Sequence, residues 1–123
     1  MGCKILLTDD DELIVMSVES MLELEGYDVT TAYNGREALD KASKNTYELF
    51  VLDIIMPGMS GFEVCKALRN LEKYAETPIV MLTAKSTELD REKGFAMGAT
   101  RFLSKPINPT ELLRVLEEVV LSK

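Results

Sequence analysis

The sequence contains no histidine and only two cysteines. Without histidine the chain cannot run a Ser-His-Asp or Cys-His mechanism, and it cannot carry a phosphoryl group on an imidazole of its own. Cys3 and Cys65 are distant from each other, form no disulfide framework and match no zinc-site spacing, so we interpret both as small buried apolar residues. Carboxylates, hydroxyls and ammonium groups remain as the candidates for chemistry.

Long apolar runs are also missing. No segment approaches the roughly 20 apolar residues of a membrane span. The N-terminus has no signal-peptide anatomy, and Leu6 stands where the N-myristoylation pattern needs Ser or Thr. The formal net charge of −7 repels nucleic-acid backbones and anionic lipid. We therefore expect a cytoplasmic protein, a monomer or weak dimer, that contacts neither a membrane nor nucleic acid directly.

Short apolar runs alternate with amphipathic stretches five times along the chain. The runs predict strands at 4–8, 28–31, 49–53, 79–83 and 101–104. The first, third and fourth are continuously apolar, which is typical of parallel strands covered on both faces. The intervening stretches therefore predict helices that cover the sheet.

The boundaries of these helices carry their own signals. Asn34, Ser60 and Asn108 are each followed three residues later by a glutamate, the pattern of a capping box. Pro109 stands at a first helical position, where its missing N–H costs nothing. Gly26 and Gly98 follow helical runs and suit the left-handed residue that ends a helix.

Five strand-helix pairs without a linker predict one domain over residues 1–123. The predicted fold is α/β: a doubly wound, five-stranded parallel sheet of order 2-1-3-4-5, the flavodoxin-like (βα)5 arrangement. In that order the first and third strands are neighbours, and ligands bind beyond their carboxyl ends.

Acidic residues follow both of these strands. Asp9, Asp10 and Asp11 come after the first strand, and Asp53 ends the third. We assign Asp11 to capping the first helix. For the other three, two like charges ~4 Å apart repel by about 4 kcal/mol at an effective dielectric of ~20, a large share of a domain's stability of about 5–15 kcal/mol. The cluster must protonate, splay apart or bind a cation, and oxygen ligands suit Mg²⁺.

Two further polar residues lie at strand ends. Thr83 ends the fourth strand and Lys105 follows the fifth. Their hydroxyl and ammonium groups are suited to binding the oxygens of a phosphoryl group on Asp53, because phosphoryl transfer needs mainly positioning and charge stabilisation.

Over nearly its whole length the sequence resembles the receiver domains of two-component response regulators. The resemblance is carried by an ordered set of segments: Asp9-Asp10, residues 53–61 (DIIMPGMSG), Thr83-Ala84 and residues 98–106 (GATRFLSKP). An acidic pair alone would be weak evidence, whereas the complete set in this order is specific.

The resemblance implies a role for each site residue. Asp53 would be the phosphoacceptor, taking its phosphoryl group from a phosphohistidine of a sensor histidine kinase or a histidine phosphotransfer protein. Asp10, Asp53 and the backbone carbonyl of Ile55 would hold Mg²⁺, with Asp9 acting through water. Thr83 and Lys105 would bind the phosphoryl oxygens, and the bond before Pro106 would be cis.

The resemblance also implies a switch that a downstream protein reads on the fourth helix, fifth strand and fifth helix. Thr83 and Phe102 match its two positions. Phe102 lacks the hydroxyl of the tyrosine often found there, so we expect its ring to favour the buried position. Thr100-Arg101 replaces the acidic pair of receivers that dimerise to drive a DNA-binding domain, which argues against that dimer.

The first helix contains four consecutive apolar residues, 13–16. Successive helical residues step by 100°, so these four cannot all face the core. We take Ile14, Val18, Met21 and Leu22 as the core stripe. Leu13, Val15 and Met16 would then face sideways or outward and form a docking patch for the helices of the phosphodonor, unless they are scattered surface residues.

Alternatives remain open. A flavodoxin has this fold, but three aspartates would repel its phosphate. A haloacid-dehalogenase-type phosphatase combines Asp, Mg²⁺, Thr or Ser and Lys, but it needs an aspartate where this chain has Ile55. A receiver that signals without phosphorylation would not need the intact acidic pair, Thr83 and Lys105. We expect a single-domain regulator rather than a piece of a longer one.

Overall fold

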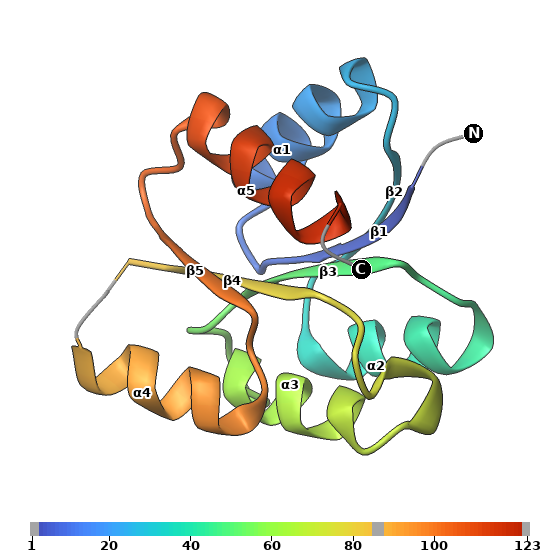
Figure 1. Ribbon diagram of the computed structural model, residues 1–123, viewed down its shortest axis with the longest axis vertical. Coiled ribbons are helices and arrows are strands. Elements are labelled where there is room, and N and C mark those ends of the chain that lie inside the picture. The colour runs from blue at the N-terminus through green and yellow to red at the C-terminus, as the bar shows by residue number, and fades with distance from the viewer. Residues whose placement is uncertain (1–2, 85–87, 122–123) are drawn as a thin grey trace.

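A five-stranded parallel sheet with helices on both faces forms the protein (Figure 1). The computed structural model describes residues 3–84 and 88–121. Its elements are β1 (Lys4–Thr8), α1 (Glu12–Leu24), β2 (Asp28–Ala32), α2 (Gly35–Lys44), β3 (Leu49–Asp53), α3 (Gly61–Arg69), η1 (Glu72–Tyr74), β4 (Ile79–Thr83), α4 (Glu88–Met97), β5 (Arg101–Ser104) and α5 (Pro109–Leu121). The strand order, β2-β1-β3-β4-β5, confirms the predicted fold.

The predicted strand boundaries agree with the structure except at β2. This strand extends one residue further than predicted, to Ala32, because Ala32 pairs with Thr8 at the end of β1. The Ala32 carbonyl also accepts a hydrogen bond from the Asp9 amide at 3.2 Å. The extra pair therefore fixes the backbone at the point where the acidic residues begin.

Side chains on successive strand residues enter two separate cores, because they alternate between the faces of a sheet. Leu6, Phe50, Leu52 and Met81 pack under α2 and α3. Ile5, Leu7, Val51 and Leu82 pack under α1 and α5. Figure 1 shows α1 and α5 on one face of the sheet and α2, α3 and α4 on the other. All residues of β3 and β4 are buried, as their continuous apolar runs predict.

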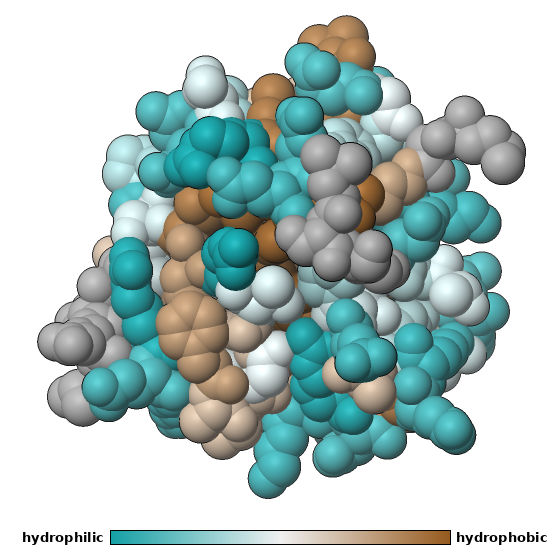
Figure 2. Space-filling view, in the orientation of Figure 1, coloured by the Kyte–Doolittle hydropathy of each residue, from teal (hydrophilic) through white to brown (hydrophobic). Residues whose placement is uncertain are grey.

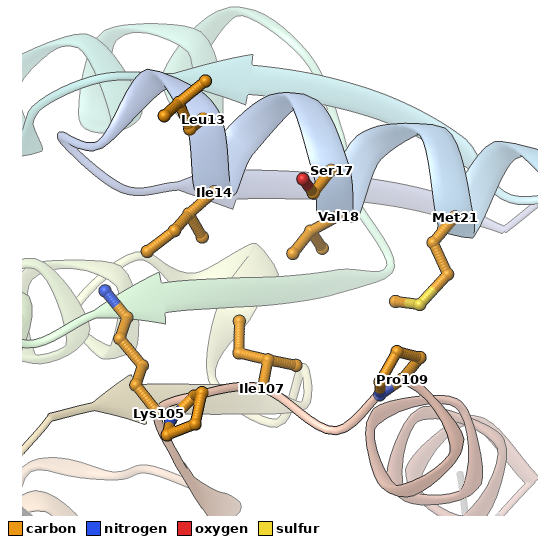
Figure 3. Close-up of a pocket in the computed structure, with 9 residues that line it drawn as sticks. Leu13, Ile14, Ser17, Val18, Met21, Lys105, Ile107 and Pro109 are labelled. Carbon is orange, nitrogen blue, oxygen red and sulfur yellow. The ribbon is translucent and has the colours of Figure 1, made fainter.

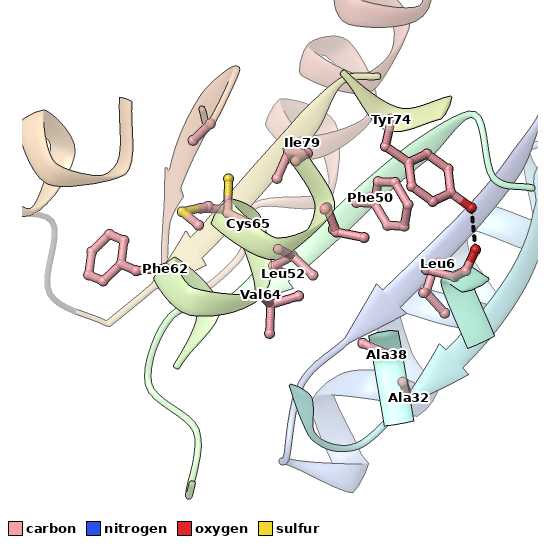
Figure 4. Packing of buried hydrophobic residues seen from close by; sticks show 14 of the residues in the cluster. Leu6, Ala32, Ala38, Phe50, Leu52, Phe62, Val64, Cys65, Tyr74 and Ile79 are labelled. Carbon is pink, nitrogen blue, oxygen red and sulfur yellow. Dashed lines mark hydrogen bonds between the residues drawn. The ribbon is translucent and has the colours of Figure 1, made fainter. Parts of the chain in front are cut away.

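Tyr74 is a polar anchor in the core under α2 and α3 (Figure 4). Its ring meets Phe50 edge-on at 4.7 Å between centroids, and its hydroxyl lies 2.8 Å from the Ala42 carbonyl oxygen. A buried hydroxyl needs such a partner, and this one ties η1 to the end of α2.

The predicted helix signals are confirmed. Asp11 accepts hydrogen bonds from the amides of Leu13 and Ile14, at 3.0 and 3.4 Å, and so caps α1. The predicted capping residues of α2, α3 and α5 accept from the amides of Glu37, Glu63 and Glu111. Gly26 and Gly98 adopt φ angles of 92° and 109°, the left-handed conformation that glycine accommodates without strain. Cys65 is buried and Cys3 is half-buried, and the two do not form a disulfide with each other.

Candidate functional site

The predicted site residues lie at one edge of the sheet, where the parallel strands end. Asp9 and Asp10 follow β1, and Asp53 is the last residue of the neighbouring strand β3. Thr83 ends β4 and is buried. Lys105 follows β5, and its amide donates to the Thr83 carbonyl at 2.8 Å. Hydrogen bonding between the strands therefore brings residues far apart in sequence to one place.

Three carboxylates meet at this edge. Asp9, Asp10 and Asp53 each offer an oxygen that lies within 4.8 Å of the others. Asp9 is completely buried, Asp53 is 4% exposed and Asp10 is exposed. One Asp9 oxygen accepts the Asp11 amide at 3.0 Å, which orients the carboxylate. The predicted convergence of the three aspartates is confirmed.

Lys105 connects the two buried carboxylates. Its Nζ lies 2.8 Å from Asp9 Oδ2 and 3.2 Å from Asp53 Oδ1. Burial by itself would lower the pKa of Lys105, but hydrogen bonding to Asp9 and the charge of Asp53 outweigh it and raise that pKa. The ammonium group is therefore charged across the physiological pH range.

Asp53 is the perturbed acid of the cluster. Burial, followed by the charge of Asp9, raises its pKa from the ordinary value of 3.8 to about 6, and the Lys105 ammonium opposes this rise. A pKa of about 6 leaves the Asp53 carboxylate ionised at pH 7 in a site that disfavours its charge. A pKa shifted in this way by burial and a neighbouring charge is typical of functional sites.

The donor set fits a hard divalent cation. Three carboxylates face one ammonium group, so negative charge is in excess. Oxygen ligands with space for water or a phosphate oxygen are what Mg²⁺ prefers. The side chain of Ile55, whose backbone carbonyl is the fourth expected ligand, is 57% exposed and leaves the edge of the site open.

Two further predicted positions lie on β5 and directly after Lys105. The Lys105-Pro106 peptide bond is cis, as predicted. Phe102 is half-buried, and its ring meets Phe95 edge-on at 5.1 Å between centroids. The switch role of Thr83 and Phe102 stays a prediction.

One part of the prediction for α1 is wrong. Val15 does not face outward: it is completely buried, in the core with Val18 and Leu22. The core stripe is therefore turned by about one residue from the predicted one, and Ile14 and Met21 lie at its margin, half-buried. Leu13 and Met16 are exposed, at 75% and 60%, as expected.

The sequence did not reveal the groove beside these residues. It has a volume of about 470 Å³ and lies between α1 and the segment joining β5 to α5 (Figure 3). Its walls are mainly apolar, and Lys105 is at one end. The lining residues are Leu13, Ile14, Ser17, Val18, Met21, Lys105, Pro106, Ile107 and Pro109. The feature of the sequence that could have indicated this groove is the apolar Ile107 between two prolines.

A second cavity, of about 310 Å³, opens on the α4 side of the site. Thr83, Ile55 and Phe62 line it together with Asp90 and Lys93 of α4. The Lys93 ammonium lies 4.8 Å from the centroid of the Phe62 ring. Nothing in the sequence pattern of α4 marked Asp90 or Lys93 as neighbours of the site.

Comparison with known proteins agrees with this geometry. The response regulator receiver domain family matches residues 5–117, so the chain belongs to that family, which functions in two-component signalling. It is a family of signalling domains rather than of conventional enzymes. In the part of the chain that the structure describes, no helix has the length and apolar character of a membrane span.

Similar proteins are found among both curated sequences and solved structures. The alkaline phosphatase synthesis transcriptional regulatory protein PhoP of Bacillus subtilis is 46% identical over 112 residues, 91% of this chain and 46% of PhoP. The chain thus spans about half the length of the curated relatives it matches. Chemotaxis protein CheY4 of Vibrio cholerae is 43% identical with a TM-score of 0.94, covering 97% of this chain and 99% of CheY4.

A third relative has a metal ion in its site. The receiver domain of a sensor histidine kinase from Pseudomonas aeruginosa is 31% identical with a TM-score of 0.90, covering 98% of each chain. Its structure has a magnesium ion coordinated in the active site cleft.

Proposed function

We propose that Asp53 accepts a phosphoryl group from a phosphohistidine on a sensor histidine kinase or a histidine phosphotransfer protein. The observation that carries this proposal is the Lys105 ammonium held between Asp9 and Asp53 within a cluster of three carboxylates. A purely structural ion pair would not need an excess of buried negative charge, which costs folding free energy. The reaction would take place in the cytoplasm.

In this reaction an Asp53 carboxylate oxygen attacks phosphorus. The new O–P bond forms as the P–N bond to the donor imidazole breaks, and the imidazole nitrogen keeps the bonding electron pair. Lys105 and the Thr83 hydroxyl would bind the phosphoryl oxygens, so the ammonium group that lies between two carboxylates would then stabilise the transferred group. The same residues would support hydrolysis of the acyl phosphate by water.

Asp10 and Asp53 would hold Mg²⁺, with Asp9 acting through water and the backbone carbonyl of Ile55 completing the protein ligands. The three converging carboxylates and the magnesium site of the Pseudomonas relative support this assignment. When bound, the ion would offset negative charge on the phosphoryl oxygens.

The test of phosphorylation is incubation with acetyl phosphate, with and without Mg²⁺, followed by mass mapping of the wild type and of Asp53→Ala. We expect one label per chain, on Asp53, that requires Mg²⁺. A label that survives Asp53→Ala would refute the proposal. Steady multiple turnover on phosphate monoesters would instead support a phosphatase of the haloacid-dehalogenase type.

The apolar groove beside α1 would bind the helices of the phosphodonor. It adjoins Lys105, and Leu13 on its wall and the nearby Met16 expose apolar surface to solvent. An occupant of the groove would therefore lie next to the phosphoacceptor. The signal would be presented to a downstream protein by α4, β5 and α5, with Thr83 and Phe102 as the switch residues.

A further inference from the structure

The negative charge of the chain is concentrated in one part of it. Residues 5–35 contain eight of the 21 acidic residues and none of the 14 basic residues. The rest of the chain has 13 acidic and 14 basic residues, so it is close to neutral. The acidic part comprises nearly all of β1, the helix α1 and the strand β2. The net charge of −7 is therefore a property of this part of the molecule rather than of its whole surface.

Helix α1 carries its acidic residues without basic neighbours. Glu12 and Glu23 are exposed, and Glu19 is half-buried. Within the part of the chain that the structure describes, none of the three forms an ion pair. Helix α2 differs, because each of its acidic residues pairs with the lysine four residues later. The carboxylates of α1 are therefore available to another molecule.

This arrangement of charges lowers the stability of α1. Glu19 and Glu23 are four residues apart, a spacing at which like charges on a helix repel. Glu23 also lies in the last turn, which has no basic residue, and the helix dipole disfavours a negative charge there. The residues that α1 buries are all apolar, so packing on the sheet does not need these carboxylates. Binding of a partner would account for acidic residues that folding does not require.

The carboxylates lie beside the exposed apolar residues of the same helix. Residues three or four apart are neighbours on a helix surface. Met16 follows Glu12 by four residues and precedes Glu19 by three, so it lies between two carboxylates. Leu13 neighbours Met16 by the same rule, and it also forms part of the wall of the apolar groove (Figure 3). A molecule that covers Met16 must therefore accommodate negative charge on both sides of its apolar contact.

We propose that the apolar face of α1 and the adjoining groove bind a protein surface in which lysine or arginine side chains flank apolar ones. The basic side chains would pair with Glu12 and Glu19, increase the rate of association and exclude acidic partners. The identity of this partner as the phosphodonor rests on the proposed function. Figure 2 shows the surface over α1 and α5, where smaller apolar areas lie among hydrophilic side chains.

The charge of α1 argues against other occupants. A second copy that docked through the same helix would bring two acidic surfaces together, and facing like charges cost free energy. Nucleic acid and anionic lipid would be repelled for the same reason. A basic protein surface is therefore the occupant that the charge distribution fits.

Binding of a labelled peptide to the whole chain tests the proposal. The probe is a helical peptide with leucines on one face and lysines on the other, and its counterpart has glutamate in place of every lysine. At low ionic strength the lysine probe should bind saturably and the glutamate probe should not, and high NaCl should weaken the binding. Fluorescence anisotropy measures the affinity, and NMR shifts of the α1 amides locate the probe. Equally tight binding of both probes, binding of neither, or shifts confined to other elements would overturn the proposal.

Charge-neutral variants test the role of the carboxylates. Glu12→Gln combined with Glu19→Gln should weaken binding of the lysine probe about fivefold, because each exposed ion pair contributes modestly. Glu72→Gln combined with Glu76→Gln is the matched control. It removes the same charge from exposed positions in and after η1, which packs on the α2 and α3 side of the sheet, and it should leave binding nearly unchanged. Equal weakening by both pairs would show that net charge alone holds the probe, and would overturn the proposal.

Thermal unfolding shows whether these variants are folded. If the Glu12 and Glu19 pair is not, Met16→Lys decides: weaker binding of the lysine probe supports the proposal, and unchanged binding overturns it. Self-association of the chain that Met16→Lys abolishes, measured by sedimentation, would show that a second copy covers α1 and would also overturn it. Failure of Asp53 to take a label from acetyl phosphate is detected by mass without any probe. That result would refute the proposed function, and the probe data would still decide the charge of the occupant.

Discussion

Asp53 experiences opposing electrostatic effects. Burial and the charge of Asp9 disfavour its ionised form, whereas Lys105, 3.2 Å away, favours it. The first two prevail, and the pKa of Asp53 rises from 3.8 to about 6. Between these values the folded state binds more protons than the unfolded state. Stability therefore falls as pH rises from about 4 to 6, and it stays lower above pH 6.

This linkage predicts that Asp53→Asn stabilises the metal-free protein at neutral pH. The amide does not titrate, so the gain should grow from near zero at pH 4 to roughly 3 kcal/mol at pH 7. Urea unfolding in a chelating buffer across that range measures it. A gain in stability of equal size at pH 4 and pH 7 would show that folding does not raise the pKa of Asp53.

Thr8 is a second residue whose surroundings predict how a substitution changes stability. It is completely buried, and its hydroxyl has no hydrogen-bond partner within residues 3–84 and 88–121. Thr8→Val replaces an unsatisfied hydroxyl by a methyl group of similar size and should stabilise the protein by about 1–2 kcal/mol. Urea unfolding measures this gain.

The same substitution at Thr83, which ends β4, is the functional control. Thr8→Val should leave labelling by acetyl phosphate unchanged, whereas Thr83→Val should slow it by removing a proposed ligand of the phosphoryl oxygens. Slower labelling of Thr8→Val would mean that the Thr8 hydroxyl contributes to the site.

At the scale of elements, α1 shows where sequence reasoning stops. Both possible core stripes of this helix contain Val18, and each is uniformly apolar, one beginning at Ile14 and the other at Val15. A helix step of 100° separates them, and only the placement of α1 on the sheet and beside α5 selects the second. The apolar pattern predicted the helix and its cap but not its rotation.

The exposed residues of α1 give the element-scale prediction. Met16→Lys should slow phosphoryl transfer from the partner kinase by about tenfold or more, because it places a charge in the proposed docking surface, and it should leave labelling by acetyl phosphate unchanged. Time courses with each donor measure the two rates.

Leu24→Lys is the control: Leu24 is 88% exposed at the far end of α1, and this change should affect neither rate. Equal slowing with both donors by Met16→Lys would contradict the docking surface.

For the whole molecule, the sequence predicted the sheet because each strand has a local signature and parallel sheets follow few connection rules. The aspartates, Thr83 and Lys105 could be placed because they stand at strand ends, and the register of a sheet brings strand ends together. The positions of Lys93 and of the apolar groove could not be predicted. They depend on how the helices pack on the sheet, and no residue pattern in the sequence specifies that packing.

The last prediction concerns the excess negative charge of the molecule, −7 overall, with three carboxylates at one edge. If Mg²⁺ binds there with a dissociation constant of about 1 mM, then 10 mM Mg²⁺ should stabilise the folded state by about 1.4 kcal/mol, a rise in melting temperature of roughly 4–8 °C. NaCl of equal ionic strength should raise the melting temperature less, because it screens the charges without binding at the carboxylates. Asp10→Asn removes an exposed ligand with little effect on packing, and should abolish the difference between the two salts. If the difference persists in Asp10→Asn, or is absent in the wild type, the carboxylates do not form the magnesium site.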